Sequence, residues 1–412
     1  MGKHIGKSVK RVEDPRFIQG QGKYVANINL PNMAHVAVLR SPHAHAKINS
    51  INTDAAKAMD GVIDVFVGQD LIDGGVGKMP VIWQVPDNKI PDRWPLVPDK
   101  VRHVGDSVAA VVAEDPYIAR DALDMIEVDY EVLEATTGAK ATTEDGKPLV
   151  HDEIENNISF KWGLGDREAC DKAFEEADHV VKLDLINQRL IANAMEPRAC
   201  AAQWTASTEN MTVWTTSQNP HIIRFGLSAV TLPMLDEHKL RVISPDVGGG
   251  FGSKIFHYPE EVIIPWIAKE INRPCKWVAT RSESFMTDSQ GRDHVQNCKM
   301  ALTSDGIITG LYVELHADMG AYLSSIAPLI PTVICITLFS GLYKNPGIWG
   351  ETTGTLTNTV PVDAYRGAGR PEASYLVERL VDVAAQELKM DPIEIRRKNF
   401  IGKDEFPYQT PV

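Results

Sequence analysis

A run of glycines in the middle of the chain has the composition of an anion-binding loop. Residues 247–254 read VGGGFGSK, with Phe251 set among four glycines. Glycine permits a positive φ and close approach of the backbone to a ligand, and successive amides can point N–H donors at oxyanions. Residues 239–244 before the loop are typical of a strand, and residues 260–271 after it have helical apolar spacing. The pattern predicts a loop that contacts a negatively charged ligand between a strand and a helix.

Neither of two familiar nucleotide-binding patterns fits this loop. The dinucleotide pattern G-x-G-x-x-G and the P-loop both require glycine where the chain has Ser253. Lys254 matches the P-loop lysine, but Ile255 follows it where Ser or Thr is required. A nucleotide-dependent dehydrogenase is therefore an alternative that the spacing counts against. A simple tight turn is the structural alternative.

Two polar segments flank the loop in the sequence. Residues 214–220 read WTTSQNP, and Pro220 predicts that a strand ends near Gln218 and that a helix follows. A Gln amide can donate a hydrogen bond to an oxygen without adding charge. Residues 363–372 read DAYRGAGRPE, in which Arg366 is a permanent cation with a planar fork of donors for oxyanions. Backbone capping by Gln218 and a surface salt bridge of Arg366 are the structural alternatives.

The order and separation of these segments resemble the molybdenum-binding large subunit of the xanthine oxidase family. Within the family the chain is most similar to aerobic carbon monoxide dehydrogenase-like large subunits. Shorter motifs, EDPRF at 13–17, SPHAHA at 41–46 and HVGD at 103–106, extend the resemblance toward the N-terminus. It implies a site for molybdopterin, in its cytosine dinucleotide form, with molybdenum. The cofactor-binding residues that it implies are Gln218, Gly249, Gly250, Phe251, Gly252, Arg366, Gly367 and Ala368. Gln218 and Arg366 would lie near the metal, with no direct protein ligand.

Three positions depart from the patterns of individual branches of the family. Carbon monoxide dehydrogenases proper have a copper-binding Cys directly after this Arg, where the chain has Gly367. Xanthine dehydrogenases have a Glu after the loop Lys and a Phe two residues after the Arg, where the chain has Ile255 and Ala368. These differences count against carbon monoxide and purines as substrates. The resemblance then implies hydroxylation of aldehydes or N-heterocycles with water-derived oxygen.

The resemblance also implies parts that lie outside this sequence. The family's catalytic base is a Glu in the second half of a full-length subunit, so we assign no catalytic residue here. Electrons would leave through iron–sulfur clusters and FAD on partner subunits. The chain would be the N-terminal half of a molybdopterin subunit, naturally split or truncated, and inactive without the second half. A non-catalytic fragment or assembly subunit without cofactor is the alternative.

Composition and charge predict a cytoplasmic globular protein. The 412 residues are 43% hydrophobic and 24% charged, with a net charge of −13. An acidic chain without a basic block is a poor non-specific ligand for nucleic acid. The five cysteines form no C-x-x-C pair, which indicates reduced thiols and no iron–sulfur cluster in this chain. No apolar run reaches the length of a membrane span.

The elements that must position these residues predict an α+β fold with two domains. Alternating strand and helix patterns over residues 1–135 indicate a small α+β domain, which the resemblance identifies as hammerhead-like. Residues 136–160 lack periodicity and predict a linker. Residues 161–412 would form the first molybdopterin-binding domain, made of mixed sheets and helices. Within it we expect a hairpin of strands 294–303 and 307–317 and a long helix over 371–388.

Other polar residues have structural interpretations. His43 and His45 would share one face of a strand, but two histidines are too few to hold a metal without a further ligand. His103, Glu196 and Asp246 are expected to be structural. Residues 195–198 (MEPR) resemble a family motif, to which the sequence assigns no chemical role.

Overall fold

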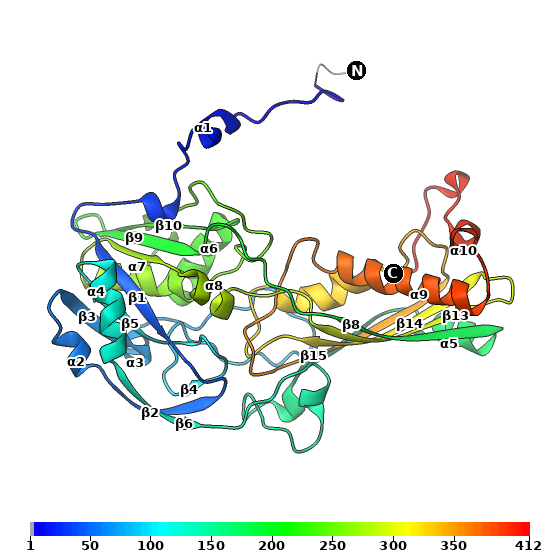
Figure 1. Ribbon diagram of the computed structural model, residues 1–412, viewed down its shortest axis with the longest axis horizontal. Helices are drawn as coiled ribbons and strands as arrows, with labels where there is room; N and C mark the ends of the chain where they lie inside the picture. The colour runs from blue at the N-terminus through cyan, green and yellow to red at the C-terminus, as the bar shows by residue number, and fades with distance from the viewer. Residues whose placement is uncertain (1–3) are drawn as a thin grey trace.

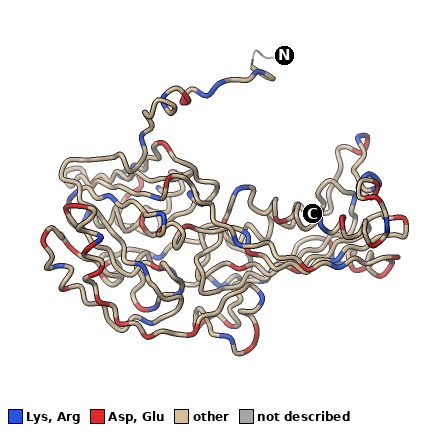
Figure 2. Tube along the Cα trace, in the orientation of Figure 1, with Lys and Arg blue, Asp and Glu red and all other residues tan. Residues whose placement is uncertain are grey.

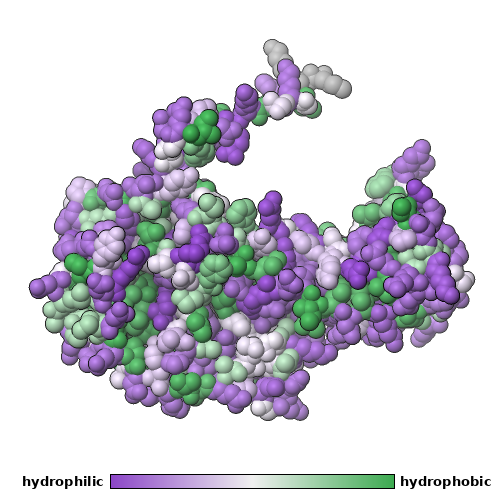
Figure 3. Space-filling model, in the orientation of Figure 1, coloured by the Kyte–Doolittle hydropathy of each residue, from purple (hydrophilic) through white to green (hydrophobic). Residues whose placement is uncertain are grey.

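The computed structural model describes residues 4–412, and its mixture of helices and strands confirms the α+β prediction. A broad lobe holds most of the N-terminal part of the chain, and a long sheet extends from it as an arm (Figure 1). The space-filling view is hollowed between the lobe and the far end of the arm (Figure 3). Acidic and basic residues are interspersed along both parts (Figure 2). No helix among the described residues combines the length and apolar character that crossing a membrane requires.

A seven-stranded sheet with the order β11-β10-β9-β12-β1-β5-β3 forms the lobe. Three of its strands precede residue 135, namely β1 (Ala34–Arg40), β3 (Val62–Val67) and β5 (Ser107–Ala113). The other four follow it, namely β9 (Ala199–Thr205), β10 (Asn210–Thr215), β11 (Leu240–Ile243) and β12 (Cys275–Val278). Parallel pairing of β1 with β12, at Ala34↔Cys275 and His35↔Lys276, joins the two groups. The domain boundary at residue 135 stays a prediction, and hydrogen-bonded pairing crosses it.

A three-stranded sheet and short helices complete the N-terminal region. The sheet has the order β4-β2-β6, with strands β4 (Lys100–Val101), β2 (Ala46–Asn52) and β6 (Glu127–Val132). The helices are α1 (Asp14–Ile18), α2 (Asp54–Lys57), α3 (Gly68–Asp73) and α4 (Pro116–Asp121). His43 and His45 lie in the turn between β1 and β2 rather than on a strand. The prediction that they share a strand face is therefore wrong, because the chain reverses at this point.

The segment 136–160, expected to be a linker, is instead packed into the protein. Val150 and Ile154 lie in the apolar core of the arm. The buried Asn157 side chain accepts a hydrogen bond from the amide of Val150 at 2.8 Å and donates to the carbonyl of Pro148 at 2.9 Å. Short 3-10 turns and irregular backbone provide the hydrogen-bond partners of these buried polar groups. Such a backbone requires no repeating pattern of apolar residues. That is why the sequence here showed no periodicity although the segment is ordered.

The arm is a five-stranded sheet with the order β7-β15-β14-β13-β8. Its strands are β7 (Ile158–Gly165), β8 (His179–Asn187), β13 (His294–Leu302), β14 (Ile308–Asp318) and β15 (Gly347–Thr355). The antiparallel pairing of β13 with β14 confirms the predicted hairpin. Helix α9 (Arg370–Glu387), as predicted, packs against β8 and β13, while α5 (Arg167–Glu175) packs against β14 and β15. Helix α10 (Pro392–Asn399) packs against α9.

Three helices surround the lobe end that carries the glycine loop. Helix α6 (Pro220–Gly226) begins at the predicted proline and continues as a π-helical turn over Leu227–Thr231. Helix α7 (Glu260–Glu270), also predicted, is buried from Glu260 through Ala268 and packs on β9. Helix α8 (Arg281–Thr287) begins at Thr280, whose hydroxyl accepts a hydrogen bond from the amide of Glu283. These helices fix the ends of the strands that carry the polar segments.

Candidate cofactor site

Gln218 and the glycine loop meet because they follow neighbouring parallel strands. Strands β10 and β11 pair in parallel, so the segments after them leave the same edge of the sheet. The amide of Gln218 donates to the carbonyl of Lys254 at 2.7 Å. The amide of Gly252 donates to Gln218 Oε1 at 2.9 Å. The side-chain oxygen of Gln218 is thus engaged by the loop, and the side chain is exposed.

Close packing explains why the loop needs glycine at two positions. A Cβ at Gly250 would lie 2.2 Å from Gln218 Oε1, well inside any real contact distance. Gly252 has φ +104°, and a Cβ there would lie 2.4 Å from the carbonyl oxygen of Ala364. Phe251 between them also has a positive φ, and its ring is 41% exposed. The loop therefore presents backbone and an aromatic ring at the surface, where a ligand could contact both.

The Arg366 segment lies directly on the glycine loop. The amide of Arg366 donates to the carbonyl of Phe251 at 2.8 Å. The guanidinium carbon of Arg366 lies 5.8 Å from the centroid of the Phe251 ring. Arg366 and Gly367 are exposed, whereas Ala368 packs beside the apolar cluster that contains Phe256. The structure thus brings Gln218, the loop glycines, Phe251 and Arg366 together and turns Ala368 toward the interior.

Arg292 holds the Arg366 segment in place, and the sequence did not single it out. Its guanidinium donates to the carbonyls of Tyr365 at 2.8 Å and Arg366 at 2.9 Å, and to Glu372 Oε1 at 3.1 Å. Glu372 is fully buried at the start of α9, and burial raises the pKa of its carboxyl group despite Arg292. A single buried cation therefore ties the Arg366 turn to the helix that follows it. The sequence offered no signal for this contact, since Arg292 and Arg366 are 74 positions apart.

Glu196 anchors the start of the glycine loop. Its Oε2 accepts hydrogen bonds from the amide of Gly248 at 2.7 Å and from Lys254 Nζ at 3.2 Å. Lys254 also donates to the carbonyl of Glu196 at 2.7 Å, and burial lowers the pKa of its ammonium group. Oε1 of Glu196 is buried and has no hydrogen-bond partner within residues 4–412. The MEPR segment at 195–198 was the available signal for this anchor.

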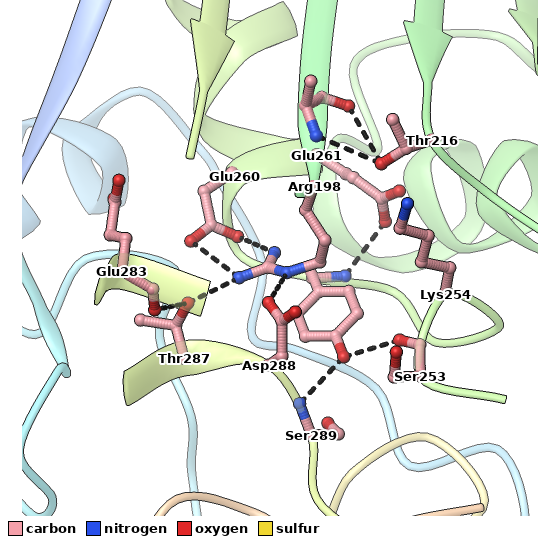
Figure 4. A network of polar contacts seen from close by, with 12 residues as sticks. Arg198, Thr216, Ser253, Lys254, Glu260, Glu261, Glu283, Thr287, Asp288 and Ser289 are labelled. Atoms are coloured by element: carbon pink, nitrogen blue, oxygen red, sulfur yellow. Dashed lines mark hydrogen bonds and ion pairs between the residues drawn. The ribbon is translucent and has the colours of Figure 1, made fainter. Parts of the chain in front are cut away.

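A buried ionic network centred on Arg198 lies beside the loop residues Ser253 and Lys254 (Figure 4). Arg198 pairs with Glu260 at 2.6 Å and with Asp288 at 2.6 Å, and its guanidinium carbon lies 3.7 Å from the centroid of the Tyr258 ring. The Tyr258 hydroxyl donates to the carbonyl of Ser253 at 2.6 Å. Burial alone would raise the pKa of Glu260, but Arg198 and Arg40 outweigh it and hold that pKa well below its usual range. The arginines and carboxylates of the network are therefore charged and paired with one another.

The other polar residues considered from the sequence lie in ion pairs or backbone contacts. His45 Nδ1 lies 2.8 Å from the carbonyl oxygen of Glu134, and His103 lies 3.3 Å from Asp106. Asp246 pairs with Arg16, which ties the N-terminal helix α1 to the segment before the glycine loop. No group of three or more His, Cys, Asp or Glu side chains that could hold a metal ion occurs in the described part of the chain.

Asp363, which opens the Arg366 segment, is buried and has no cationic partner among residues 4–412. The amides of Ala364 and Ile326 donate to its carboxylate at 2.7 and 3.1 Å. Burial raises the pKa of Asp363 from 3.8 to about 7, although these donors oppose the shift. The folded protein therefore holds a proton on Asp363 under mildly acidic conditions, where the unfolded chain has lost it.

We predict that Asp363 makes the protein less stable as the pH rises from about 4 to 7. The folded state binds more protons than the unfolded state in this window, so stability falls as the proton is lost. Asp363→Asn should remove this contribution and reduce the difference in melting temperature between pH 5 and pH 7.5. The exposed control Asp60→Asn should leave that difference as in the wild type. An unchanged pH dependence in Asp363→Asn would contradict the prediction.

The free donors of the site fit an anionic, oxygen-rich group such as the molybdenum cofactor. Gln218 Oε1 is occupied by the Gly252 amide, and its NH₂ group has no acceptor among the described residues. The Arg366 guanidinium likewise has no carboxylate or carbonyl partner among them. The site therefore presents hydrogen-bond donors and one positive charge that no described residue engages and that an anionic ligand could bind. The cofactor-binding roles of Gln218, Arg366 and the loop remain predictions.

Comparisons with known proteins identify both parts of the chain. Residues 150–400 match the molybdopterin cofactor-binding domain family, and residues 19–134 match the a/b hammerhead domain of aldehyde oxidase and xanthine dehydrogenase. These matches confirm the predicted combination of a hammerhead domain and a molybdopterin-binding domain.

Individual relatives are named as dehydrogenases or oxidoreductases. The carbon monoxide dehydrogenase large chain of Hydrogenophaga pseudoflava is 36% identical over 412 residues, which cover 97% of this chain and 50% of that relative. The nicotinate dehydrogenase large molybdopterin subunit of Eubacterium barkeri is 32% identical over 398 residues, which cover 96% of this chain and 89% of that relative. Quinoline 2-oxidoreductase from Pseudomonas putida 86 superposes with a TM-score of 0.93 and 33% identity over all of this chain and 52% of that structure.

The chain spans about half the length of the first and third of these proteins and most of the second. The match to the cofactor-binding domain covers more than half of the chain and includes all three site segments. The chain therefore belongs to the xanthine oxidase family of molybdenum hydroxylases, as a large, molybdopterin-binding subunit of the carbon monoxide dehydrogenase-like type.

Proposed function

We propose that this chain forms part of the molybdenum-cofactor site of an oxidoreductase that hydroxylates aldehydes or N-heterocycles with water-derived oxygen. The observation that carries the proposal is that the Gln218 NH₂ group and the Arg366 guanidinium, which have no partner among the described residues, both lie against the glycine loop at one edge of the lobe. When bound, the cofactor would supply nucleophile generation and electron acceptance.

The chain's own residues would bind and shield that group. The Gln218 NH₂ would donate a hydrogen bond to an oxygen on the metal, because the Gly252 amide already holds the opposite end of the side chain. Arg366 would place a fixed positive charge beside developing negative charge, which is most effective where water is excluded. The half-exposed ring of Phe251 would exclude water by covering the metal site.

Two observations at the site support an aldehyde or a non-purine N-heterocycle as the substrate, rather than carbon monoxide or a purine. Gly367 has φ +94°, and a Cβ there would lie 2.9 Å from the Pro371 ring, so a Cys would strain this turn. Ile255 and Ala368 both pack with the apolar cluster around Phe256 and offer no charged group to a purine. Quinoline 2-oxidoreductase, a structural relative, is named for an N-heterocyclic substrate.

The remaining components of the reaction would come from elsewhere. We place the catalytic Glu in the region of the family's large subunits that these 412 residues do not match, whether on the same or another polypeptide. Electrons would pass to iron–sulfur and FAD subunits, and the cofactor would be the cytosine dinucleotide form. We expect the assembly to be cytoplasmic. A non-catalytic subunit without cofactor is the competing proposal.

Metal analysis separates the two proposals. The protein purified with the subunits that accompany it should contain stoichiometric molybdenum and release cytidine monophosphate on acid hydrolysis. The 412-residue chain by itself should contain little molybdenum and oxidise no aldehyde, because the only donors identified here for the cofactor come from Gln218, the glycine loop and Arg366. An assembled complex without molybdenum would contradict the function. An isolated, monodisperse chain with stoichiometric molybdenum and aldehyde oxidation would contradict the need for the remaining region.

A further inference from the structure

One face of the seven-stranded lobe sheet has a gap in its cover. Helix α4 packs on β1 and β5, and the 3-10 turn Val25–Asn27 packs on β9. Strand β12 lies between β9 and β1 in the sheet, so these two covers leave a cavity of about 330 Å³ over β1 and β12. That volume is within the usual range for small-molecule sites. None of the lining residues belongs to the candidate cofactor site.

Much of the lining of this cavity is apolar. Ala37 and Val278 come from the neighbouring strands β1 and β12, and Trp277 precedes Val278. Pro116 and Leu123 come from α4 and from the 3-10 turn that follows it. Transfer of an apolar group from water onto such a surface is favourable. A ligand that fills the cavity must therefore carry an apolar body.

Two cations in the lining have no carboxylate partner among the described residues. Lys276 is buried, and its ammonium donates to two backbone carbonyls and to Asn29 Oδ1, at 3.2, 2.8 and 2.9 Å. These neutral oxygens engage the donors of Lys276 but leave its charge without a counter-ion. Arg120 on α4 is exposed, and its guanidinium has no hydrogen bond or ion pair in the described part of the chain. Arg120 therefore has free donors for an anion.

The other titratable groups of the lining are paired or neutral. Arg40 pairs with Glu283 at 2.7 Å. Burial, followed by the charge of Lys276, lowers the pKa of His35, so its ring is neutral at pH 7 and offers a hydrogen-bonding nitrogen rather than a charge. Asp115 opposes this shift from the residue before α4, but it does not line the cavity. The cavity is therefore positive, although the chain has a net charge of −13.

We propose that this cavity binds an organic monocarboxylate with an apolar body. The free guanidinium of Arg120 would hold the carboxylate through paired N–H donors, and His35 would donate one further hydrogen bond. The apolar body would cover Ala37, Val278 and Leu123. An inorganic anion would leave this apolar surface in water, and an uncharged alcohol would leave Arg120 without a counter-ion. The proposal does not depend on the molybdenum cofactor or on the substrate.

Isothermal titration of the assembled protein with sodium octanoate tests the role of the charge. One octanoate should bind per copy of this chain, and 1-octanol should bind roughly tenfold more weakly or worse. Arg120→Glu should raise the dissociation constant for octanoate roughly tenfold or more, because a carboxylate replaces the cation. Arg241→Glu is the matched control and should leave the constant unchanged. Arg241 is likewise exposed and without an ion pair among the described residues, but it lies on β11 at the edge of the same sheet.

The chain length of the acid tests the role of the apolar lining. From butanoate through hexanoate to octanoate, the dissociation constant should fall roughly fourfold for each added methylene, the usual gain from burying one such group. Inorganic phosphate should not compete with octanoate. The proposal is overturned if the assembled protein does not bind octanoate, if Arg120→Glu binds it as tightly as the wild type, or if butanoate and octanoate bind equally well.

Discussion

Replacing Gln218 with Ala is expected to lower the turnover of the assembled enzyme by about 10²–10³-fold, the usual cost of removing one donor to a reacting oxygen. The Gln218 NH₂ is the only side-chain amide brought onto the glycine loop by a described contact, and the Gly252 amide holds its other end at 2.9 Å. Steady-state kinetics on protein with measured molybdenum content would test this. Turnover should fall while the metal content stays close to that of the wild type.

Gln218→Glu distinguishes donation to the ligand from support of the loop. A Glu at this position can still accept the hydrogen bond from Gly252, but it presents a carboxylate oxygen where the NH₂ donor was. We therefore expect Gln218→Glu to lose as much activity as Gln218→Ala. Recovery of activity in Gln218→Glu would show that the side chain only supports the loop.

Arg366 provides an independent test of the same site. Arg366→Ala should greatly reduce turnover, and Arg366→Lys should restore little of it, because a Lys lacks the planar fork of donors. Arg379→Ala, at a half-exposed position of α9, is the control and should be close to wild type. Near-normal turnover in both Gln218→Ala and Arg366→Ala, with molybdenum retained, would contradict the assigned site.

Replacing Arg198 with Met is expected to lower the free energy of unfolding by about 3–5 kcal/mol, the cost of removing one member of a buried ion pair. The side chain of Arg198 is 5% exposed and that of Glu260 is 1% exposed, so water cannot replace the lost contact. Asp288 would also lose its cationic partner. Denaturant titration of the wild type and the variant would measure the difference.

An exposed arginine provides the control for that measurement. Arg397 pairs with Glu394 at 2.7 Å, but both side chains are more than half exposed. Arg397→Met should therefore lower the free energy of unfolding by less than about 1 kcal/mol.

Because Tyr258 connects Arg198 to the carbonyl of Ser253, we also expect Arg198→Met to reduce the molybdenum content of the assembled protein. If the free energy of unfolding of Arg198→Met lies within about 1 kcal/mol of the wild type, solvent or neighbouring groups compensate for the lost cation.

The sequence by itself determined the elements whose signals are local. The helix after Pro259, the hairpin of β13 and β14, and the helix that contains Pro371 depend on residue spacing within a few turns or one strand pair. The glycine loop could likewise be recognised from its own segment, because backbone freedom is a property of its residues. The roles of Gln218 and Arg366 came instead from the family resemblance and stay predictions.

The tertiary structure alone decided what supports those residues. Glu196 reaches Gly248 across 52 positions, and Arg198 reaches Asp288 across 90. The linker predicted at 136–160 is packed, because its buried groups find partners in irregular turns rather than in a periodic element. Buried charges and irregular segments are stabilised by partners distant in the sequence, and a local pattern carries no information about which partners the fold will bring near.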